Sequence, residues 1–370
     1  MKRSAVSAVT FAACLVSALL TASPQSAPAS SPSWNSRAAA AYLDGRMDWW
    51  LSWPTAQRDH ETACVSCHTA LPYALARPAL RGAFADRAVS APERRMLEHV
   101  VKRVTLWKDV EPFYPDQTRG LPKTSESRAT EAILNALILS TRDAQSGTLS
   151  DEGRQAFANL WPLQFKAGDQ TGAWTWLNFH NEPWEANGSP YFGNALAALA
   201  IGTAPGGYAA SPDIQDRLQL LQRYLQNGVE TESLYNRLTV LWASGKWPTL
   251  LTPVQRHAIV QAALATQQED GGWTMASLSN WKRTDGSTLD TTSDGLATGL
   301  ATLALQQAGV SRSDAHLSRG LAWLVQHQDA ATGMWSASSL NKQRDPASDA
   351  GQFMSDAATA YAVLSLTNER

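Results

Sequence analysis

Hydrophobic residues in the second half of the chain recur at the spacing of an α-helix. Within residues 293–309, Leu296, Leu300 and Leu303 fall at i, i+4 and i+7, so they lie on one face of a helix. Alanine and glycine between them allow neighbouring helices to approach closely. Similar runs occupy residues 128–140, 191–202 and 355–366. β-branched alternation is nearly absent, and proline and glycine are largely confined to the connections, so the pattern predicts an all-α fold.

Three segments carry glutamine, a short polar stretch and then Gly-x-Trp. They are residues 164–174, 267–273 and 326–335, and the last two follow helical runs at residues 259–268 and 319–328. The repeats are too irregularly spaced for a short-period solenoid, and they suit paired helices joined by long loops. We expect the tryptophans to lie at helix-end turns, stack on the glutamines and tie one helix pair to the next. These residues are Trp174, Trp273 and Trp335.

These repeats resemble the QW motifs of the squalene–hopene cyclase family. The likeness covers roughly residues 128–366, and it is clearest in residues 263–273 and 319–335. It implies an α/α toroid over residues 126–370, in which inner and outer helices alternate around an apolar central cavity. In that family the cavity folds a polyprenyl chain onto a protonating aspartate.

The acidic residues depart from the family pattern. Cyclases of this family carry Asp-x-Asp-Asp at the start of an inner helix, whereas the nearest segment here, "LDTTSDGLATG", offers only Asp290 and Asp294. Asp294 directly precedes an apolar helix, where a carboxylate caps the helix or complements its dipole. The alternative makes it a general acid or a substrate anchor, with Asp290 as a second candidate catalytic residue. Asp356 and Glu131 stand at comparable positions and allow the same two interpretations.

A different chemistry is indicated by "CVSCH". Cys64, Cys67 and His68 have the C-x-x-C-H spacing of c-type haem attachment, in which two thiols bond to the haem and the histidine ligates the iron. A redox-active pair, a zinc site and a plain disulfide are the alternatives. The flanking sequence looks helical, no second cysteine pair exists, and a disulfide leaves His68 unexplained. Arg77 and Arg81 are candidate partners for the haem propionates.

The sixth iron ligand stays open in the sequence. The motif lies in a helical haem-binding segment, residues 34–125, and residues 93–107 have the pattern of a helix interior. A five-coordinate iron with an open face is the alternative to a sixth protein ligand. The candidates for that ligand are Met96, His99, Met47 and His60.

The N-terminus reads as an export signal. Lys2 and Arg3 precede an apolar run at residues 5–20 and a small, proline-rich stretch, which predicts a signal peptide cleaved near residue 29. A retained membrane anchor is the alternative. Cleavage leaves no transmembrane helix and places the protein in the periplasm or otherwise outside the cytoplasm. The net charge of −2 provides no basic field, so nothing indicates nucleic-acid binding.

Three hypotheses for function follow. The first is an exported haem c protein whose toroid supports redox chemistry or electron transfer with an apolar, isoprenoid-like ligand and a redox partner protein. The second is an electron-transfer or binding protein that uses the toroid only as a scaffold. The third is a terpenoid cyclase without redox chemistry.

Overall fold

The computed structural model describes Met1 and residues 33–84 and 88–368. The predicted signal peptide, residues 1–29, lies outside the described residues apart from Met1. The described part is mainly helical, as predicted. Its α-helices are α1 Ser36–Ser52, α2 Ala70–Ala83, α3 Ala91–Thr105, α4 Asp116–Arg119, α5 Lys123–Ala144, α6 Asp151–Leu160, α7 Ser189–Thr203, α8 Gln215–Gly228, α9 Leu234–Ser244, α10 Pro253–Ala265, α11 Met275–Leu278, α12 Gly295–Gln307, α13 Ala315–Gln326 and α14 Phe353–Thr367.

Short elements fill some of the connections. Four 3₁₀ turns occur among the described residues, at Pro54–Ala56, Trp161–Leu163, Tyr208–Ala210 and Pro212–Ile214. The strands β1 Gln57–Arg58 and β2 Thr62–Ala63 pair antiparallel just before the C-x-x-C-H motif. No helix of the described residues is long and apolar enough to cross a membrane.

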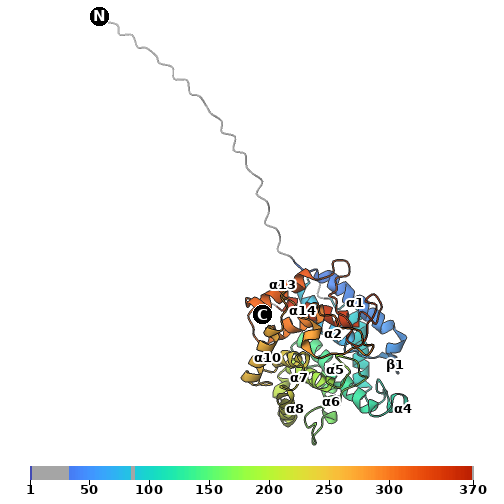
Figure 1. The fold of residues 1–370 in the computed structure, drawn as a ribbon. Coiled ribbons are helices and arrows are strands. Elements are labelled where there is room, and N and C mark those ends of the chain that lie inside the picture. The colour runs from blue at the N-terminus through green and yellow to red at the C-terminus, as the bar shows by residue number, and fades with distance from the viewer. Residues whose placement is uncertain (2–32, 85–87, 369–370) are drawn as a thin grey trace. The chain divides into compact units, whose positions relative to one another are not determined.

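Six inner helices of the described chain form a closed ring. They are α2, α5, α7, α9, α12 and α14; each packs against the next, and α14 packs back against α2. The longer helices between them, α1, α3, α6, α8, α10 and α13, each pack on the outside of one or two inner helices. Figure 1 shows the blue N-terminal helix α1 near the red C-terminal helix α14. The α/α toroid expected from the sequence is therefore present, and α1 and α2 supply one of its outer–inner pairs.

The inner helices all run in the same direction. Residues near the C-terminal ends of all six, such as Thr141, Thr203 and Gln307, line one cavity of about 270 Å³. Their N-terminal ends therefore meet at the opposite face, which we call the mouth of the ring. The first residues of α2 follow His68 directly, so the C-x-x-C-H motif lies at this mouth.

The tryptophans of the three repeats are buried at the turns between outer and inner helices, as predicted. The Trp335 side chain is 0% exposed, its indole nitrogen donates to the Leu324 carbonyl at 2.7 Å, and its amide donates to Thr359 Oγ1 at 3.0 Å. Leu324 belongs to outer helix α13 and Thr359 to inner helix α14. Trp273 and Trp174 repeat this arrangement between the preceding pairs. Each tryptophan thus fixes one outer helix to the following inner helix.

The glutamines act by hydrogen bonding, whereas the sequence suggested stacking on tryptophan. Gln164 and Gln267 each donate to a glycine carbonyl in their own turn and to a carbonyl at the next outer helix. In the third repeat Gln328 donates to the Gly333 carbonyl of its own turn. It also donates, at 3.0 Å, to the carbonyl of Asn35, the residue that caps α1. This last contact joins the final repeat to the first helix, so it helps to close the ring.

Glycine is required in these turns by close backbone approach. Gly333 has φ of +78°, and a Cβ there would lie 2.3 Å from the Ala38 carbonyl carbon. Gly172 has φ of +94° and would clash in the same way with the Leu220 carbonyl oxygen at 2.2 Å. Any larger residue would therefore push the next outer helix away from the turn.

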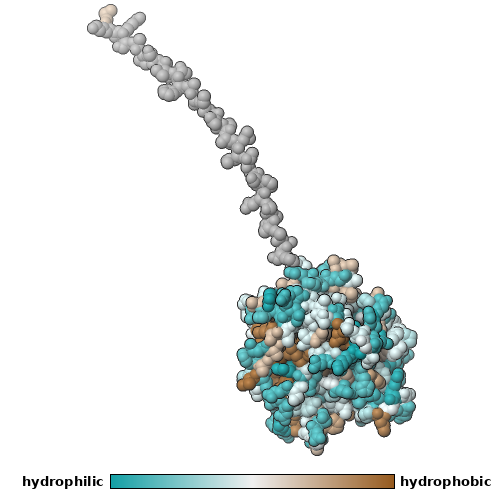
Figure 2. All heavy atoms as spheres, in the orientation of Figure 1, coloured by the Kyte–Doolittle hydropathy of each residue, from teal (hydrophilic) through white to brown (hydrophobic). Residues whose placement is uncertain are grey.

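The face of the molecule shown in Figure 2 is dominated by hydrophilic residues, with hydrophobic ones in small separate groups. The large apolar side chains that are strongly exposed in the described ranges include Leu121 at 85% and Val254 at 78%. Single exposed residues of this kind are ordinary on soluble surfaces and indicate no interaction site.

Replacing Trp335 by alanine should lower the free energy of unfolding by about 3–5 kcal/mol, because a fully buried indole and its hydrogen bond are lost. Denaturant unfolding followed by circular dichroism measures the change. Val254→Ala, at an exposed position on α10, is the control and should leave stability nearly unchanged. Equal stability of the two variants would contradict the role given to the repeat tryptophans.

Candidate functional site

The C-x-x-C-H loop is fixed between β2 and α2 by backbone hydrogen bonds. The Cys64 amide donates to the Ala56 carbonyl at 2.8 Å, and the Trp50 indole nitrogen donates to the Cys64 carbonyl at 2.7 Å. Ser66 Oγ accepts from the amides of Thr69 and Ala70 at 3.2 and 3.0 Å, which caps the start of α2. The loop therefore presents its side chains from a fixed backbone.

The strands before the loop are held by a buried cation. Arg103 of α3 is 0% exposed; it donates to Thr62 Oγ1 at 2.8 Å and pairs with Glu131 of α5. Glu131, for which the sequence allowed a catalytic or a structural role, is thus the partner of a buried arginine. This pair connects the ring to the hairpin that leads into Cys64.

Cys64, Cys67 and His68 line one cavity of about 360 Å³ at the mouth. Both thiols are free and buried, and burial raises the pKa of Cys64 to about 12 and that of Cys67 as well. The thiols are therefore protonated at neutral pH. The other lining residues include polar, charged and aliphatic side chains together with six aromatic ones, which are Trp50, Trp53, Phe113, Tyr114, Phe179 and Phe353. The cavity thus brings two free thiols and an imidazole together with several aromatic rings.

His68 is held as a neutral imidazole. Burial, helped by the nearby Arg46 charge, lowers the pKa of His68 to about 3. Its ring stacks on Phe353 with centroids 3.8 Å apart and meets Trp50 edge-on at 5.1 Å. A neutral imidazole with restricted rotation is the form in which histidine binds a metal.

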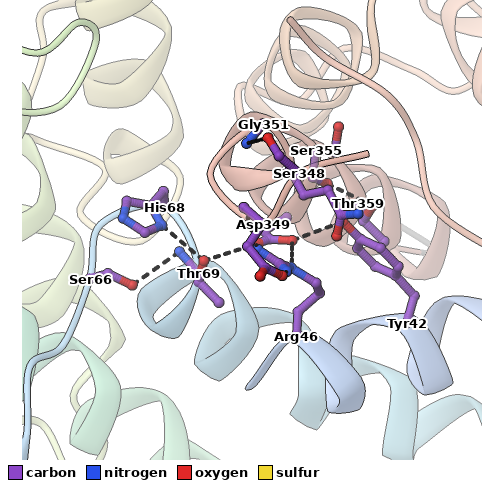
Figure 3. A network of polar contacts seen from close by, with 12 residues as sticks. Tyr42, Arg46, Ser66, His68, Thr69, Ser348, Asp349, Gly351, Ser355 and Thr359 are labelled. Atoms are coloured by element: carbon purple, nitrogen blue, oxygen red, sulfur yellow. Dashed lines mark hydrogen bonds and ion pairs between the residues drawn. The ribbon is translucent and has the colours of Figure 1, made fainter. Parts of the chain in front are cut away.

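A chain of hydrogen bonds leads from His68 through Thr69 to the buried carboxylate of Asp356. Figure 3 labels His68, Thr69, Arg46 and Tyr42 of this network. His68 Nδ1 lies 2.8 Å from Thr69 Oγ1, and Thr69 Oγ1 donates to Asp356 Oδ2 at 2.6 Å. Arg46 Nε and the Tyr42 hydroxyl donate to Asp356 Oδ1 at 2.7 and 2.8 Å. Burial raises the pKa of Asp356 to about 6, while its pairing with Arg46 opposes that rise. Asp356 is on α14 and Arg46 on α1, so this network spans the seam between the last and first helices.

Two arginines that line the cavity were not singled out by the sequence. Arg58 and Arg119 are both part of its wall, and the buried Nε of Arg58 has no hydrogen-bond partner in the described residues. Arg77 and Arg81, the propionate partners suggested by the sequence, are bound instead to Asp44 and Glu93. Two guanidinium groups in the cavity wall provide positive charge next to the space that the thiols and His68 line.

The four candidates for a sixth iron ligand lie elsewhere. Met47 of α1 and Met96 of α3 are buried in the hydrophobic core, His99 of α3 is half-buried, and His60 is exposed and bonded to Asp59. In the described structure none of the four lines the cavity of His68. Residues 33–84 and 88–368 contain no cluster of three or more His, Cys, Asp or Glu side chains that could hold a metal ion alone.

Glu185 is a cavity residue that the sequence did not reveal. It lines the cavity with the cysteines and also a neighbouring hollow of about 140 Å³ that includes Cys67 and His68. Burial raises its pKa to about 7, with the Asn181 side chain and the Lys123 charge opposing the rise. It comes from the loop between the first repeat and α7, where a lone glutamate between Trp184 and Ala186 gives no motif to recognise. A carboxyl with a pKa of about 7 therefore lies beside Cys67 and His68.

Asp294 caps α12, as one of its two interpretations predicted. Its Oδ1 accepts from the amides of Leu296 and Ala297 at 3.0 and 2.9 Å, and Oδ2 accepts from the Met275 amide at 2.6 Å. Burial raises its pKa to about 7 in spite of these bonds. Asp290 lies with it in the wall of a small hollow of about 60 Å³. Its carboxylate is bound by Thr292 of its own turn.

The C-x-x-C-H motif and Asp294 belong to one row of adjoining hollows along the mouth. The 140 Å³ hollow at His68 shares Ser339 and Arg344 with a hollow of about 320 Å³. That hollow in turn shares Asp290 with the one at Asp294. Cys67 and Asp294 are thus at the two ends of the row, in separate cavities.

Comparison with known families supports the resemblance seen in the repeats. Residues 217–349 match the squalene-hopene cyclase C-terminal domain. This part of the ring, from α8 to the loop before α14, is cyclase-like in sequence and includes Asp290 and Asp294. A comparison with curated proteins gives no match.

Two solved structures align over most of this chain at low sequence identity. The apo type II terpene cyclase MstE from Scytonema aligns with a TM-score of 0.45 and 13% identity, covering 90% of this chain and 98% of that one. A glycosidase aligns with a TM-score of 0.48 and 13% identity, covering 90% and 95%.

Glu185→Gln should stabilise the protein at high pH and not at low pH. The folded-state pKa is raised, so wild type loses stability as pH rises from about 4.5 to about 7, whereas the glutamine variant does not. The variant should gain up to about 3 kcal/mol relative to wild type above pH 7. Denaturant unfolding at pH 4 and pH 8 measures this, with the exposed Glu230→Gln as control. A gain that is the same at both pH values would show that Glu185 is not titrating as described.

Proposed function

We propose that the protein is an exported c-type haem protein in which Cys64 and Cys67 hold the haem and His68 Nε2 ligates its iron. The cavity lined by both free thiols and by His68 is the observation that carries this proposal. Its aromatic walls suit the porphyrin, and Arg58 and Arg119 offer cations to the propionates. The predicted signal peptide supports export, the setting in which covalent haem is normally attached.

We propose further that the iron keeps an open sixth position. None of Met47, His60, Met96 and His99 lines the cavity, which argues against each of these four as a sixth ligand. Haem with an open position supplies one-electron chemistry and binds small ligands such as oxygen or peroxide. Glu185, with a pKa of about 7, would take up or release a proton beside it. This favours a haem-dependent oxidoreductase, served by a redox partner protein, over a carrier that uses the toroid as a scaffold.

The cyclase-like ring suggests an isoprenoid-like ligand, and the hollows at the mouth refine that suggestion. The 320 Å³ hollow is lined largely by hydroxyl, amide and guanidinium groups, including Thr288, Ser338, Gln343 and Arg283. A purely hydrocarbon chain would take these polar groups out of water and offer them no hydrogen bonds in return. The ligand we propose therefore has an apolar body and a polar end that enters this hollow.

A second candidate function is terpenoid cyclisation without redox chemistry. The match of residues 217–349 to a cyclase domain favours it, as does the raised pKa of Asp294. Three backbone amides donate to that carboxyl, which favours its ionised form and weakens its case as a proton donor. Cyclisation of a linear isoprenoid by the haem-free protein, lost in Asp294→Asn, would establish this function instead.

The protein made with intact haem-attachment machinery should carry covalent haem. A haem stain on a denaturing gel should be positive for wild type and at least tenfold weaker for the Cys64→Ala, Cys67→Ala double variant, because both thioether bonds are removed. Val65→Ala changes the same loop and keeps both thiols, so it should stain like wild type. A colourless wild type would contradict the proposal.

The reduced protein should bind carbon monoxide without any denaturant. The reason is that none of the four candidate sixth ligands lines the cavity, so the gas can reach the proposed open position of the iron. The Soret absorption measured before and after addition of the gas reports this. Met96→Leu should behave like wild type. A spectrum unchanged by carbon monoxide would show a sixth protein ligand and favour the electron-carrier function.

A further inference from the structure

We propose that Thr69 and Asp356 are positioning residues for the haem iron, which hold His68 with a proton on Nδ1 and a free electron pair on Nε2. This inference rests on the proposed function, and it concerns how the ring itself determines the axial ligand. The contacts that carry it are those of the seam network (Figure 3).

The direction of each hydrogen bond follows from counting hydrogens. Asp356 is contacted only by donors in the described network: Arg46 Nε at 2.7 Å and Nη2 at 3.2 Å, the Tyr42 hydroxyl at 2.8 Å, and Thr69 Oγ1 at 2.6 Å. The two bonds from the Arg46 guanidinium, which keeps its charge, hold the carboxylate ionised. An ionised carboxylate can only accept, so both hydroxyls must donate to it. The single hydroxyl hydrogen of Thr69 is therefore committed to Asp356.

Thr69 Oγ1 can then only accept from His68. The 2.8 Å contact to Nδ1 must be an N–H donated by the imidazole. A ligating imidazole nitrogen carries no hydrogen, so with the hydrogen on Nδ1 it is Nε2 that offers its electron pair to a metal. The stacking of the ring on Phe353 and its edge contact with Trp50 oppose rotation out of this orientation.

The same bonds adjust how strongly His68 would donate to iron. A hydrogen bond from Nδ1 toward a carboxylate makes the imidazole a better electron donor, and such outer partners matter to metal sites. Here the carboxylate acts through a hydroxyl, and Arg46 balances its charge. Because Asp356 is on α14 and Arg46 on α1, closure of the ring and the state of the axial ligand depend on one set of contacts.

Thr69→Val is the decisive variant, since valine has nearly the same shape and lacks the hydroxyl. Thr69→Ser restores the hydroxyl, and Thr55→Val changes another threonine of the cavity wall outside the network. The measurement is the iron–histidine stretching frequency of the reduced, haem-loaded protein by resonance Raman spectroscopy, which falls as the imidazole becomes less basic. The reduction potential of each protein is recorded alongside it.

The stretching frequency should fall and the potential should rise in Thr69→Val, while Thr69→Ser and Thr55→Val stay near wild type. Asp356→Asn should shift both values in the same direction if it folds. Covalent haem in all variants with unchanged values for Thr69→Val would overturn the positioning role and leave the proposed function standing. Absence of covalent haem from wild type would instead mean that the proposed function itself is wrong.

Discussion

Closure of the ring depends on the buried carboxylate of Asp356, which needs a cationic partner. Asp356 is 1% exposed at the start of α14, and it is neutralised by Arg46 of α1, which is 6% exposed. Removing one partner of such a pair leaves an uncompensated buried charge and costs about 3–5 kcal/mol. Arg46 also donates to the carboxylate and the carbonyl of Asp349 in the loop before α14. This one side chain of α1 therefore holds both α14 and the loop that leads into it. A second contact joins the same two ends of the ring: Gln328, which follows α13, donates to the carbonyl of Asn35, which precedes α1.

The seam between α14 and α1 is also where the proposed haem site lies. Because α2 is an inner helix, the C-x-x-C-H loop before it opens into the mouth of the ring. A covalently attached group there would contact α1, the hairpin, the loop around Glu185 and the start of α14 at once. This arrangement differs from a cytochrome domain joined by a linker, since the residues around His68 come from both ends of the sequence. The polar hollows that continue toward Asp294 would give the proposed ligand a path to the cavity of Cys67 and His68.

The sequence predicted the features that depend on local pattern. Leu296, Leu300 and Leu303 identified α12, and each Gly-x-Trp identified a turn. Both kinds of feature are determined by residues that are close together in the sequence. The sequence could not pair Arg46 with Asp356, because the two residues are 310 positions apart and the residues around each contain no signal for the other. Arg77 and Arg81 were suggested by nearness in sequence, whereas Arg58 and Arg119 line the cavity because of how the ring folds. Glu185 has an ordinary sequence context, and only burial makes it unusual.

The position of iron in the haem-loaded protein tests this arrangement most directly. Anomalous diffraction at the iron edge from crystals of the mature protein locates the metal independently of any assumption about the haem. A single iron peak should lie within bonding distance of His68 Nε2, inside the cavity bounded by Trp50 and Phe353, with His68 Nδ1 still bonded to Thr69. Crystals without an iron peak, or with iron bound away from His68, would contradict the assignment of this cavity as a haem site.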